Sequence, residues 1–283
     1  MTVVPFSQVD LSVVIPVLNE ERILRENLTT LAAHLNEIVG TGNWQFVLVD
    51  NGSTDRTPEI IQEILVQYPP SKTVHVAQPN YGAALRAGFR EADTEFAHTC
   101  DVEQWDIPFL VWAWGERHNH DLFIGSKRSD PTISKQSTVR RLLSWGLNAL
   151  IQLFFGYMGT ETHGPKVIHL ARLRPIIDSC VSERGQFDTE IVLRTVRRGL
   201  RIAEAPIAFS ETRPPRTKIF KKVAWNLVAF NRLRRIMRDV DYDGPVEFRQ
   251  FSRSDVLKAF QRSVGREALG ASAAAGNRAA LRD

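Results

Sequence analysis

The sequence of 283 residues is poor in cysteine and in long apolar runs. Its two cysteines, Cys100 and Cys180, cannot build a disulfide framework, which excludes the small disulfide-rich secreted class. No run reaches the roughly 18 consecutive apolar residues that a membrane-spanning helix requires, since the best one, 147–158, is interrupted by Asn148 and Gln152. The first residues also lack the charged region and apolar core of a signal peptide. We therefore expect a cytoplasmic protein that does not span a bilayer unaided.

Acidic residues are missing from one long stretch of the chain. The segment 213–238 holds nine lysines and arginines and no Asp or Glu, although the formal net charge of the whole chain is only +4. Such a segment can face nucleic acid, an anionic membrane surface or a phosphate-bearing substrate, or it can be the solvated face of a helix. The overall composition, with 43% hydrophobic and 24% charged residues, is typical of a globular protein.

Apolar runs alternate with segments of helical periodicity over the first hundred residues. The predicted strands are 11–16, 44–49, 72–77 and 95–100. The predicted helices are 20–39, 57–67 and 83–92. This alternation predicts an α/β fold with a doubly wound, mostly parallel sheet, in which ligands bind at the carboxyl ends of the strands. Polar clusters at 16–20, 50–53 and 101–103 follow three of these strands, so we expect them to meet in one cleft.

Asp101 and Glu103 stand one residue apart just after the fourth predicted strand. An isolated acidic pair is often a solvated loop, but two carboxylates in this place can also bind Mg²⁺ or Mn²⁺, and through the ion a diphosphate. The ion would neutralise charge on a nucleoside diphosphate as it leaves a sugar carbon. Asp106 is the alternative to Glu103 as the second ligand. The histidines lack partners at zinc spacing, so no zinc site is expected.

The polar cluster after the second predicted strand has the chemistry of a nucleotide site. Asp50 or Asn51 can hydrogen-bond the edge of a nucleobase, and Gly52 and Ser53 allow the backbone to approach the ribose. Glu20, after the first strand, can accept a ribose hydroxyl or favour the positive end of the following helix.

Four segments, in this order and spacing, resemble the family 2 glycosyltransferases of the GT-A fold, and within them the polyprenyl-phosphate sugar transferases of the dolichyl-phosphate mannose synthase type. These segments are 14–21, 49–57, 80–88 and the acidic motif at 101–103. The resemblance covers roughly residues 11–218 and extends more weakly through 124–128, 140–148, 164–166, 187–190 and 204–207. It implies a Rossmann-like sheet flanked by helices, a metal-dependent and inverting reaction, and a nucleotide-diphosphate sugar as the donor. The nucleotide-sugar-binding residues that it implies are Pro16, Leu18, Glu20, Asp50, Asn51, Ser53, Asn80 and Gly82.

Several positions depart from the pattern of this family. Asn51 stands where a second Asp is common, Leu18 where an aromatic ring is common, and Glu103 where a second Asp of the acidic motif is usual. Pro165, in a segment where the family has Cys-Gly-Phe-Lys, lacks a backbone N–H. These differences leave the choice between uridine and guanosine open. They also motivate an alternative, a degenerate domain that binds a nucleotide without turnover.

The acceptor can be considered from the chemistry of its attacking oxygen. A sugar hydroxyl requires a carboxylate base, for which Asp188 and Glu190 are the catalytic candidates beside Asp101. A lipid phosphate is already anionic and requires cations instead. The resemblance implies phosphate-binding residues at or beside Lys127, Arg128, Arg140, Arg213 and Arg216.

We therefore predict transfer of a sugar to a polyprenyl phosphate, with a soluble enzyme acting on a glycan or small-molecule hydroxyl as the alternative. The predicted organisation is a GT-A domain over 1–218, a C-terminal helical segment over 219–264 and a disordered tail over 265–283. Apolar residues mixed with lysine and arginine over 219–237 favour a helix in a membrane interface, and a core-packed helix is the other interpretation. We expect a cytoplasmic protein with peripheral contact to the inner face of the membrane as an option, and no nucleic-acid partner.

Overall fold

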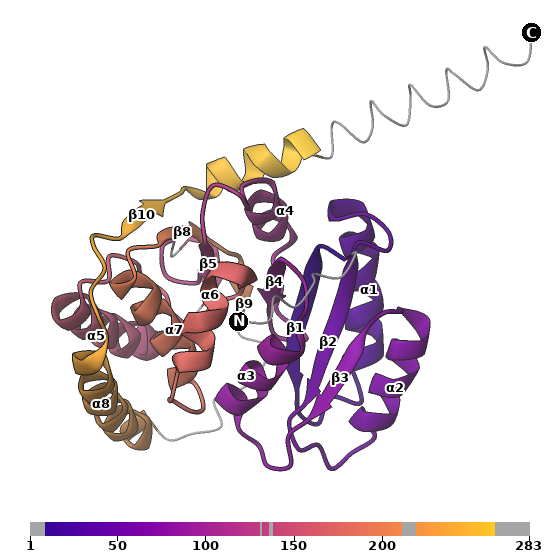
Figure 1. The fold of residues 1–283 in the computed structure, drawn as a ribbon, viewed down its shortest axis with the longest axis horizontal. Coiled ribbons are helices and arrows are strands. Elements are labelled where there is room, and N and C mark those ends of the chain that lie inside the picture. The colour runs from indigo at the N-terminus through magenta and orange to yellow at the C-terminus, as the bar shows by residue number, and fades with distance from the viewer. Residues whose placement is uncertain (1–8, 131, 136–137, 211–218, 264–283) are drawn as a thin grey trace, which may run out of the picture.

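The computed structural model describes residues 9–130, 132–135, 138–210 and 219–263. Among these residues, eight strands form one sheet in the order β10-β8-β5-β7-β4-β1-β2-β3, and β6 pairs with β9 in a small second sheet (Figure 1). The strands are β1 (Leu11–Val17), β2 (Trp44–Asp50), β3 (Lys72–His75), β4 (Phe96–Thr99), β5 (Leu122–Ser126), β6 (Ser134–Lys135), β7 (Lys166–His169), β8 (Arg201–Pro206), β9 (Phe209–Ser210) and β10 (Glu247–Gln250). In the large sheet β7 runs antiparallel to β4 and β5, and the other neighbours are parallel.

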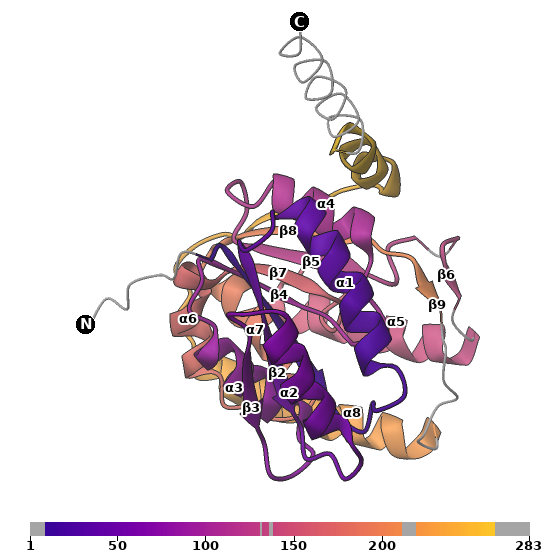
Figure 2. The same cartoon turned by 90° about the vertical axis from the view of Figure 1, so that its right-hand side faces the viewer.

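Helices cover both faces of this sheet (Figures 1 and 2). They are α1 (Leu24–Ile38), α2 (Thr57–Gln67), α3 (Tyr81–Glu91), α4 (Ile107–Gly115), α5 (Thr138–Phe155), α6 (Leu170–Ser179), α7 (Gln186–Arg197), α8 (Ile219–Ile236), a 3₁₀ turn (Met237–Asp239) and a helix at 253–263. One hydrophobic core lies under α1, α2, α4 and the helix at 253–263, and a second lies under α3 and α5–α8. The mixed α/β fold expected from the sequence is confirmed.

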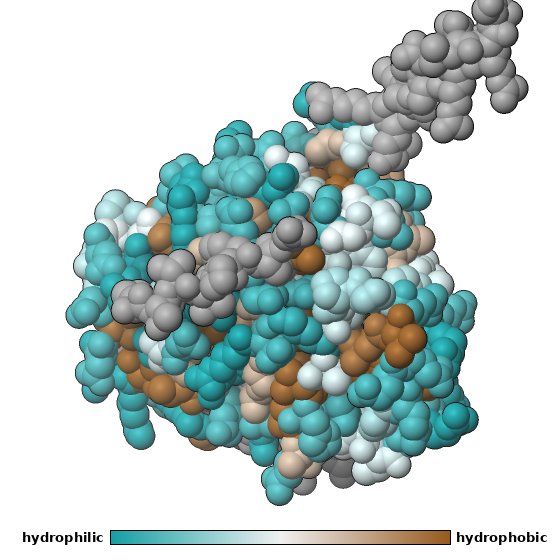
Figure 3. All heavy atoms as spheres, turned by 45° about the vertical axis from the view of Figure 1, so that its right-hand side comes forward, coloured by the Kyte–Doolittle hydropathy of each residue, from teal (hydrophilic) through white to brown (hydrophobic). Residues whose placement is uncertain are grey.

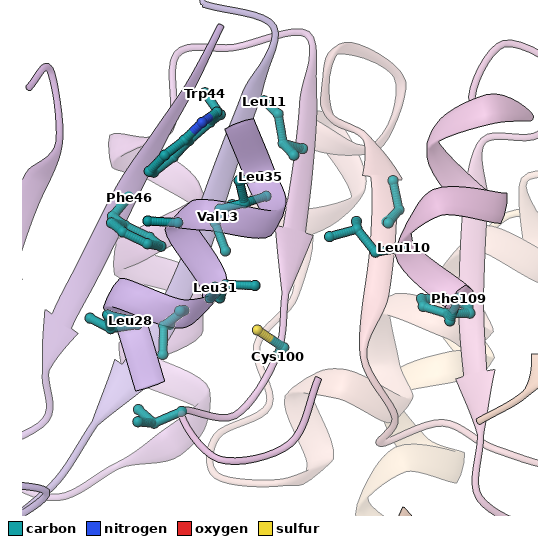
Figure 4. Packing of buried hydrophobic residues seen from close by; sticks show 14 of the residues in the cluster. Leu11, Val13, Leu28, Leu31, Leu35, Trp44, Phe46, Cys100, Phe109 and Leu110 are labelled. Carbon is teal, nitrogen blue, oxygen red and sulfur yellow. The ribbon is translucent and has the colours of Figure 1, made fainter. Parts of the chain in front are cut away.

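The first βαβ unit forms where the hydrophobic pattern predicts it. Every residue of β2 is buried, as expected for a parallel strand covered on both faces. On α1, Leu28, Leu31 and Leu35 recur at helical spacing and pack over the sheet together with Phe46 (Figure 4). The helix begins at Leu24, four residues later than predicted, because residues 18–23 form a loop at the end of β1.

The C-terminal part differs from the predicted helical segment over 219–264. After α8 the chain enters β10, which pairs with β8 in parallel, so that Glu247 lies opposite Arg201. β10 therefore lies outside β8, at the edge of the sheet. The helix at 253–263 then lies beside α4 in both views (Figures 1 and 2). The predicted tail over 265–283 lies outside the described residues.

The second half of α8 packs on the core. Phe230 and Leu233, and Met237 in the 3₁₀ turn that follows, are buried in the second hydrophobic core, whereas Arg232 and Arg235 are exposed. The side chains of 219–227 lie outside the described residues. No helix in the described part of the chain is long and apolar enough to cross a membrane.

Candidate active site

The site lies at the carboxyl edge of the sheet, between β1 and β4. Chain order runs from β1 to β2 and β3 on one side, while β4 lies on the other side of β1. β4 pairs with β1 only as far as Thr99, opposite Val14, whereas β1 continues beside β2 to Val17. Such a change of direction in a doubly wound sheet is where ligands bind.

A cleft that is open to solvent lies at this edge. Its lining comes from the ends of β4, β5 and β8, from the start of α3 and from the segment before β7. The lining residues are Tyr81, Thr99, Cys100, Asp101, Gln104, Trp105, Asp106, Lys127, His163, Gly164, Pro165, Ile207, Ala208 and Phe209. The cleft therefore combines acidic, basic and aromatic groups.

The acidic motif forms a tight turn in this cleft. The Gln104 N–H donates to the Asp101 carbonyl at 3.2 Å, and Val102 is buried in the hydrophobic core between its two acidic neighbours. Asp101 is exposed to the solvent of the cleft, yet protein atoms enclose it closely. This enclosure raises the pKa of Asp101, the Lys127 ammonium acts against the rise, and Asp188 and Glu103 add to it. Asp101 is thus in electrostatic reach of both Lys127 and Asp188.

Asp106 has a different environment from Asp101. It is 8% exposed and caps α4, because its Oδ1 accepts the Phe109 N–H at 2.8 Å. Its Oδ2 accepts the Ala208 N–H at 2.8 Å. The Arg253 guanidinium contacts both oxygens, at 2.9 and 2.8 Å. Both oxygens are occupied, so Asp106 would have to give up these bonds in order to bind a metal ion.

The predicted nucleotide residues after β2 are buried and held in place. Asp50 Oδ1 accepts the Ser53 N–H at 3.0 Å, and Oδ2 lies 2.8 Å from His75 Nδ1. Asn51 Oδ1 accepts the Asn80 N–H at 2.7 Å. Asn51 therefore links the end of β2 to the segment that opens α3, where Tyr81 lines the cleft.

The loops after β1 and β2 are joined to each other. The Asn19 N–H donates to Ser53 Oγ at 3.1 Å, and the Glu20 N–H donates to Thr57 Oγ1 at 2.9 Å. The Asn51 N–H donates to the carbonyl of Val17, the last residue of β1. The predicted residues at these two strand ends are thus brought together: Pro16, Leu18, Glu20, Asp50, Asn51 and Ser53.

Asn80 and Gly82 fix the start of α3 against the segment before α7. Asn80 Oδ1 caps the helix by accepting the Ala83 N–H at 3.2 Å and also accepts the Arg184 N–H at 3.0 Å. A Cβ on Gly82 would lie 2.6 Å from the Arg184 backbone. Burial raises the pKa of Tyr81 well above its usual value, and the nearby Asp188 and Asp101 raise it further.

Of the predicted phosphate-binding residues, the structure places one in the cleft and one in an ion pair, and it does not describe the side chains of the other three. Lys127 lines the cleft, with its Nζ 4.3 Å from the centre of the Phe209 ring. Arg128 forms an ion pair with Glu161, at 2.7 Å between Nη2 and Oε1. The side chain of Arg140, on α5, is not among those the structure describes, and Arg213 and Arg216 lie outside the described residues altogether.

Asp188 and Glu190 lie in the first turns of α7 and are both buried. Asp188 Oδ1 lies 2.8 Å from Lys166 Nζ, and its Oδ2 is buried without a hydrogen-bond partner in the described structure. Glu190 accepts the N–H groups of Val181 and Ser182 and forms an ion pair with Arg194 at 2.7 Å. Of the two candidate bases, Asp188 has an unoccupied oxygen, and it is in electrostatic reach of Asp101.

No group of three or more potential metal ligands from His, Cys, Asp and Glu occurs within the described residues. Asp101 and Glu103 supply hard oxygen atoms from one turn. Mg²⁺ in particular is often bound by one or two carboxylates together with substrate phosphates and water, so this donor set fits an ion that arrives with a diphosphate.

Sequence reasoning missed several residues that line the cleft. Trp105 and Phe209 supply aromatic surface, and the exposed His163 also lines the cleft. Desolvation by the protein atoms around it lowers the pKa of His163, whereas the nearby Asp188 and Glu161 act in the opposite direction. Phe209 follows β8 by three residues, so its place beside a strand end was the one signal that pointed to it.

Residues 12–136 match the family model Glycosyl transferase family 2. This part of the chain carries a family 2 glycosyltransferase domain. The dolichyl-phosphate beta-glucosyltransferase of Saccharomyces cerevisiae is 28% identical over 227 residues, which are 72% of this chain and 68% of that protein. The undecaprenyl-phosphate 4-deoxy-4-formamido-L-arabinose transferase of Edwardsiella ictaluri is 36% identical over 148 residues, 50% of this chain and 43% of that protein.

The fold of this glycosyltransferase is shared with solved structures. A mannosyltransferase from Pyrobaculum calidifontis, solved with GDP-mannose and Mn²⁺, superposes with a TM-score of 0.55 at 18% identity, over 98% of this chain and 76% of that one. The family model and the relatives confirm the predicted family and enzyme class, and the solved structure confirms the GT-A architecture.

Proposed function

We propose that this glycosyltransferase moves a sugar from a nucleotide-diphosphate sugar to a polyprenyl phosphate, with a divalent cation and with inversion at the sugar carbon. The observation that carries the proposal is the meeting of Asp101 and Lys127 in one cleft, close enough for the ammonium to act on the carboxyl pKa. An acidic turn suits a metal–diphosphate, and a lysine beside an aromatic wall suits a phosphate that carries an apolar chain.

The relatives support the acceptor class. The yeast and Edwardsiella proteins are named as transferases of dolichyl phosphate and undecaprenyl phosphate, and both names describe a phosphate on a polyprenyl chain. In this chain the cleft wall formed by Ile207, Ala208 and Phe209 is apolar and lies beside Lys127. A phosphate at Lys127 would therefore have apolar surface next to it.

The donor side is supported by the ends of β1 and β2. Asp50 and Asn51 would bind the base and Ser53 the ribose, while Asp101 and Glu103 would hold Mg²⁺ or Mn²⁺. We propose Glu103 as the second ligand, since it lies in the same turn as Asp101 at the edge of the cleft. When bound, the ion supplies charge neutralisation for the leaving diphosphate. Mn²⁺ accompanies GDP-mannose in the Pyrobaculum structure, which agrees with this donor set.

A phosphate acceptor requires no general base, because its oxygen is already anionic at neutral pH. Asp188 is buried and paired with Lys166, and Glu190 is occupied by two backbone amides and Arg194. Neither carboxylate is needed to remove a proton under this proposal. Lys127 would orient the phosphate oxygen toward the sugar carbon, on the face opposite the leaving diphosphate.

A surface on α5, on the residues just after it and on α8 supports peripheral contact with a membrane. Leu153, Phe154, Met158 and Val228 are large hydrophobic residues with 43–77% of their surface exposed, and Phe154 touches Phe230 across the two helices. The Arg234 guanidinium lies 4.9 Å from the centre of the Phe154 ring. Apolar residues bordered by arginine are typical of interfacial surfaces. The face shown in Figure 3 is mostly hydrophilic, with its hydrophobic residues in separate patches.

The decisive experiment offers UDP- and GDP-sugars with dolichyl or undecaprenyl phosphate in detergent and measures sugar in the organic phase. We expect lipid-linked product with Mn²⁺ or Mg²⁺, loss of product in Asp101→Ala, and normal product in Glu37→Gln, which alters an exposed carboxylate on α1. Transfer to a hydroxyl acceptor that stops in Asp188→Asn would overturn the phosphate assignment. Nucleotide binding without any turnover would favour a degenerate domain.

Membrane contact has its own test, flotation with vesicles. We expect the wild type to bind phosphatidylglycerol vesicles, and a double variant with Leu153→Ser and Met158→Ser to bind them more weakly. Equal binding by the wild type and the double variant would remove the α5–α8 surface from the proposal.

A further inference from the structure

The C-terminal segment 247–263, hereafter the strap, reaches from the edge of the sheet to the cleft. β10 lies on β8, and the Phe251 N–H donates to the Glu204 carbonyl at 2.8 Å. The Phe251 ring lies 4.8 Å from the ring of Trp112 on α4. Val256, on the helix at 253–263, is fully buried in the core under α1 and α4. The strap is thus a packed part of the domain, although it lies more than 100 residues beyond the region matched by the family model.

A capping box sets the position of Arg253 on this strap. The Ser252 N–H donates to Asp255 Oδ2 at 3.0 Å, and the Asp255 N–H donates to Ser252 Oγ at 3.2 Å. This reciprocal pair fixes the first turn of a helix. Arg253 is therefore held at the helix start, where its Nη1 reaches both oxygens of Asp106 and, at 3.1 Å, the Pro206 carbonyl.

We propose that Arg253 is a positioning residue for the acceptor side of the cleft, an inference that rests on the proposed function. Arg253 acts through Asp106, which in turn accepts the Ala208 N–H. Ala208 and Phe209 form the wall beside which Lys127 lies. One ion pair therefore connects the strap, the start of α4 and the wall next to the lysine.

The charge of this pair matters as much as its geometry. Asp106 lines a cleft that must accept both a diphosphate and a phosphate, and its side chain is only 3% exposed. With Arg253 the pair is neutral. Without Arg253 a buried negative charge would remain uncompensated beside the anionic ligands, which a protein interior tolerates poorly. We expect such a charge to weaken the acceptor phosphate most, since the donor diphosphate arrives with a cation.

The test compares Arg253→Met with Arg249→Met, which removes an exposed cation from the same strap without touching Asp106. We expect Arg253→Met to raise the KM for polyprenyl phosphate about tenfold, equivalent to about 1.4 kcal/mol, and to lower kcat less. Arg249→Met should match the wild type. Adding Asp106→Asn to Arg253→Met should recover most of the loss, because it removes the uncompensated charge, and Arg253→Lys should recover part of it.

The outcomes separate this inference from the proposed function. A wild type that makes no lipid-linked sugar overturns the proposed function. A wild type that transfers, with an unchanged acceptor KM in Arg253→Met, overturns the role of Arg253. If Arg253→Met is impaired but Asp106→Asn adds to the damage, the contact is merely structural and the inference is wrong. The affinity of each variant for inorganic phosphate, measured by calorimetric titration, tests the same expectation without the transfer reaction. A variant that only has a lower melting temperature but binds phosphate like the wild type would not support the inference.

Discussion

Lys166 Nζ lies 2.8 Å from Asp188 Oδ1, and both side chains are almost completely buried beneath the cleft. Lys166 opens β7 and Asp188 lies in the first turn of α7, so the ion pair joins the sheet to a helix. Lys166 also donates to the Gly164 carbonyl at 2.9 Å, which ties it to a residue that lines the cleft.

Lys166→Met should destabilise the domain more than removal of both charges does. The substitution leaves Asp188 buried without its partner, and such losses cost about 3–5 kcal/mol. Lys166→Met combined with Asp188→Leu removes both charges and should recover part of that free energy of unfolding, measured by urea denaturation. Additive losses from the two single substitutions would show that the pair is not coupled.

His98 should make the stability of the domain depend on pH. Burial lowers the pKa of His98 to about 4, and its Nδ1 lies 2.9 Å from the Lys166 carbonyl. Because the folded pKa lies below the unfolded value of about 6.5, the unfolded state binds more protons between these values, so stability falls as the pH drops from 6.5 to 4. The loss should approach about 3 kcal/mol near pH 4.

The substitution His98→Asn isolates this effect, because an amide can still donate to the Lys166 carbonyl but does not titrate. The free energy of unfolding of the variant should lose this part of its slope between pH 6.5 and 4. A slope equal to that of the wild type would mean that other groups are responsible.

Local sequence patterns predicted the first hundred residues because their elements depend on local periodicity. The leucines of α1 and the apolar run of β2 pack in the same hydrophobic core. The position of the polar residues at the strand ends then follows from the topology of the sheet. β10 was not predicted, because it has four residues, mostly exposed, and depends on pairing with β8. A strand of that kind carries little pattern of its own.

The residues of the site fall into the same two groups, those predicted from the local sequence and those whose role depends on contacts between distant parts of the chain. Asp101 was found because it follows a predicted strand, and Lys127 because its segment, 124–128, resembles the family. The role of Asp106 could not be found, since its partner Arg253 is 147 residues away in the sequence. Likewise Arg128 looked like a cation for a phosphate, but Glu161, which pairs with it, is brought near only by the fold. Spacing in the sequence does not show which cations already have a buried partner.

Gly82→Ala should damage the donor side of the site. The new Cβ would lie 2.6 Å from both the N and O atoms of Arg184, and backbone cannot move aside as a side chain can. We expect a lower melting temperature and weaker Mn²⁺-dependent nucleotide binding, because α3 starts beside Asn51 and Tyr81. Gly146→Ala on α5, where a Cβ meets nothing within 4 Å, is the matched control and should be neutral or stabilising. Equal nucleotide binding in both variants would contradict this account.

The two cations after β5 should have separable effects, one on transfer and one on acid stability. Burial acts to raise the pKa of Glu161, but the Arg128 guanidinium and the His163 N–H bring it down to about 2. Since the folded pKa lies below the usual value of 4.5, this carboxylate contributes stability above that pH and loses it as the pH falls toward 2. The contribution at neutral pH is about 3 kcal/mol.

Glu161→Gln and Arg128→Met should both reduce stability at pH 7 and flatten its decline in acid, measured by chemical denaturation across pH. Lys127→Met should keep the decline toward pH 2 that Glu161 causes, while it impairs transfer to polyprenyl phosphate. If Lys127→Met instead reproduced the acid profile of Arg128→Met and transferred normally, the assignment of the two residues would have to be exchanged.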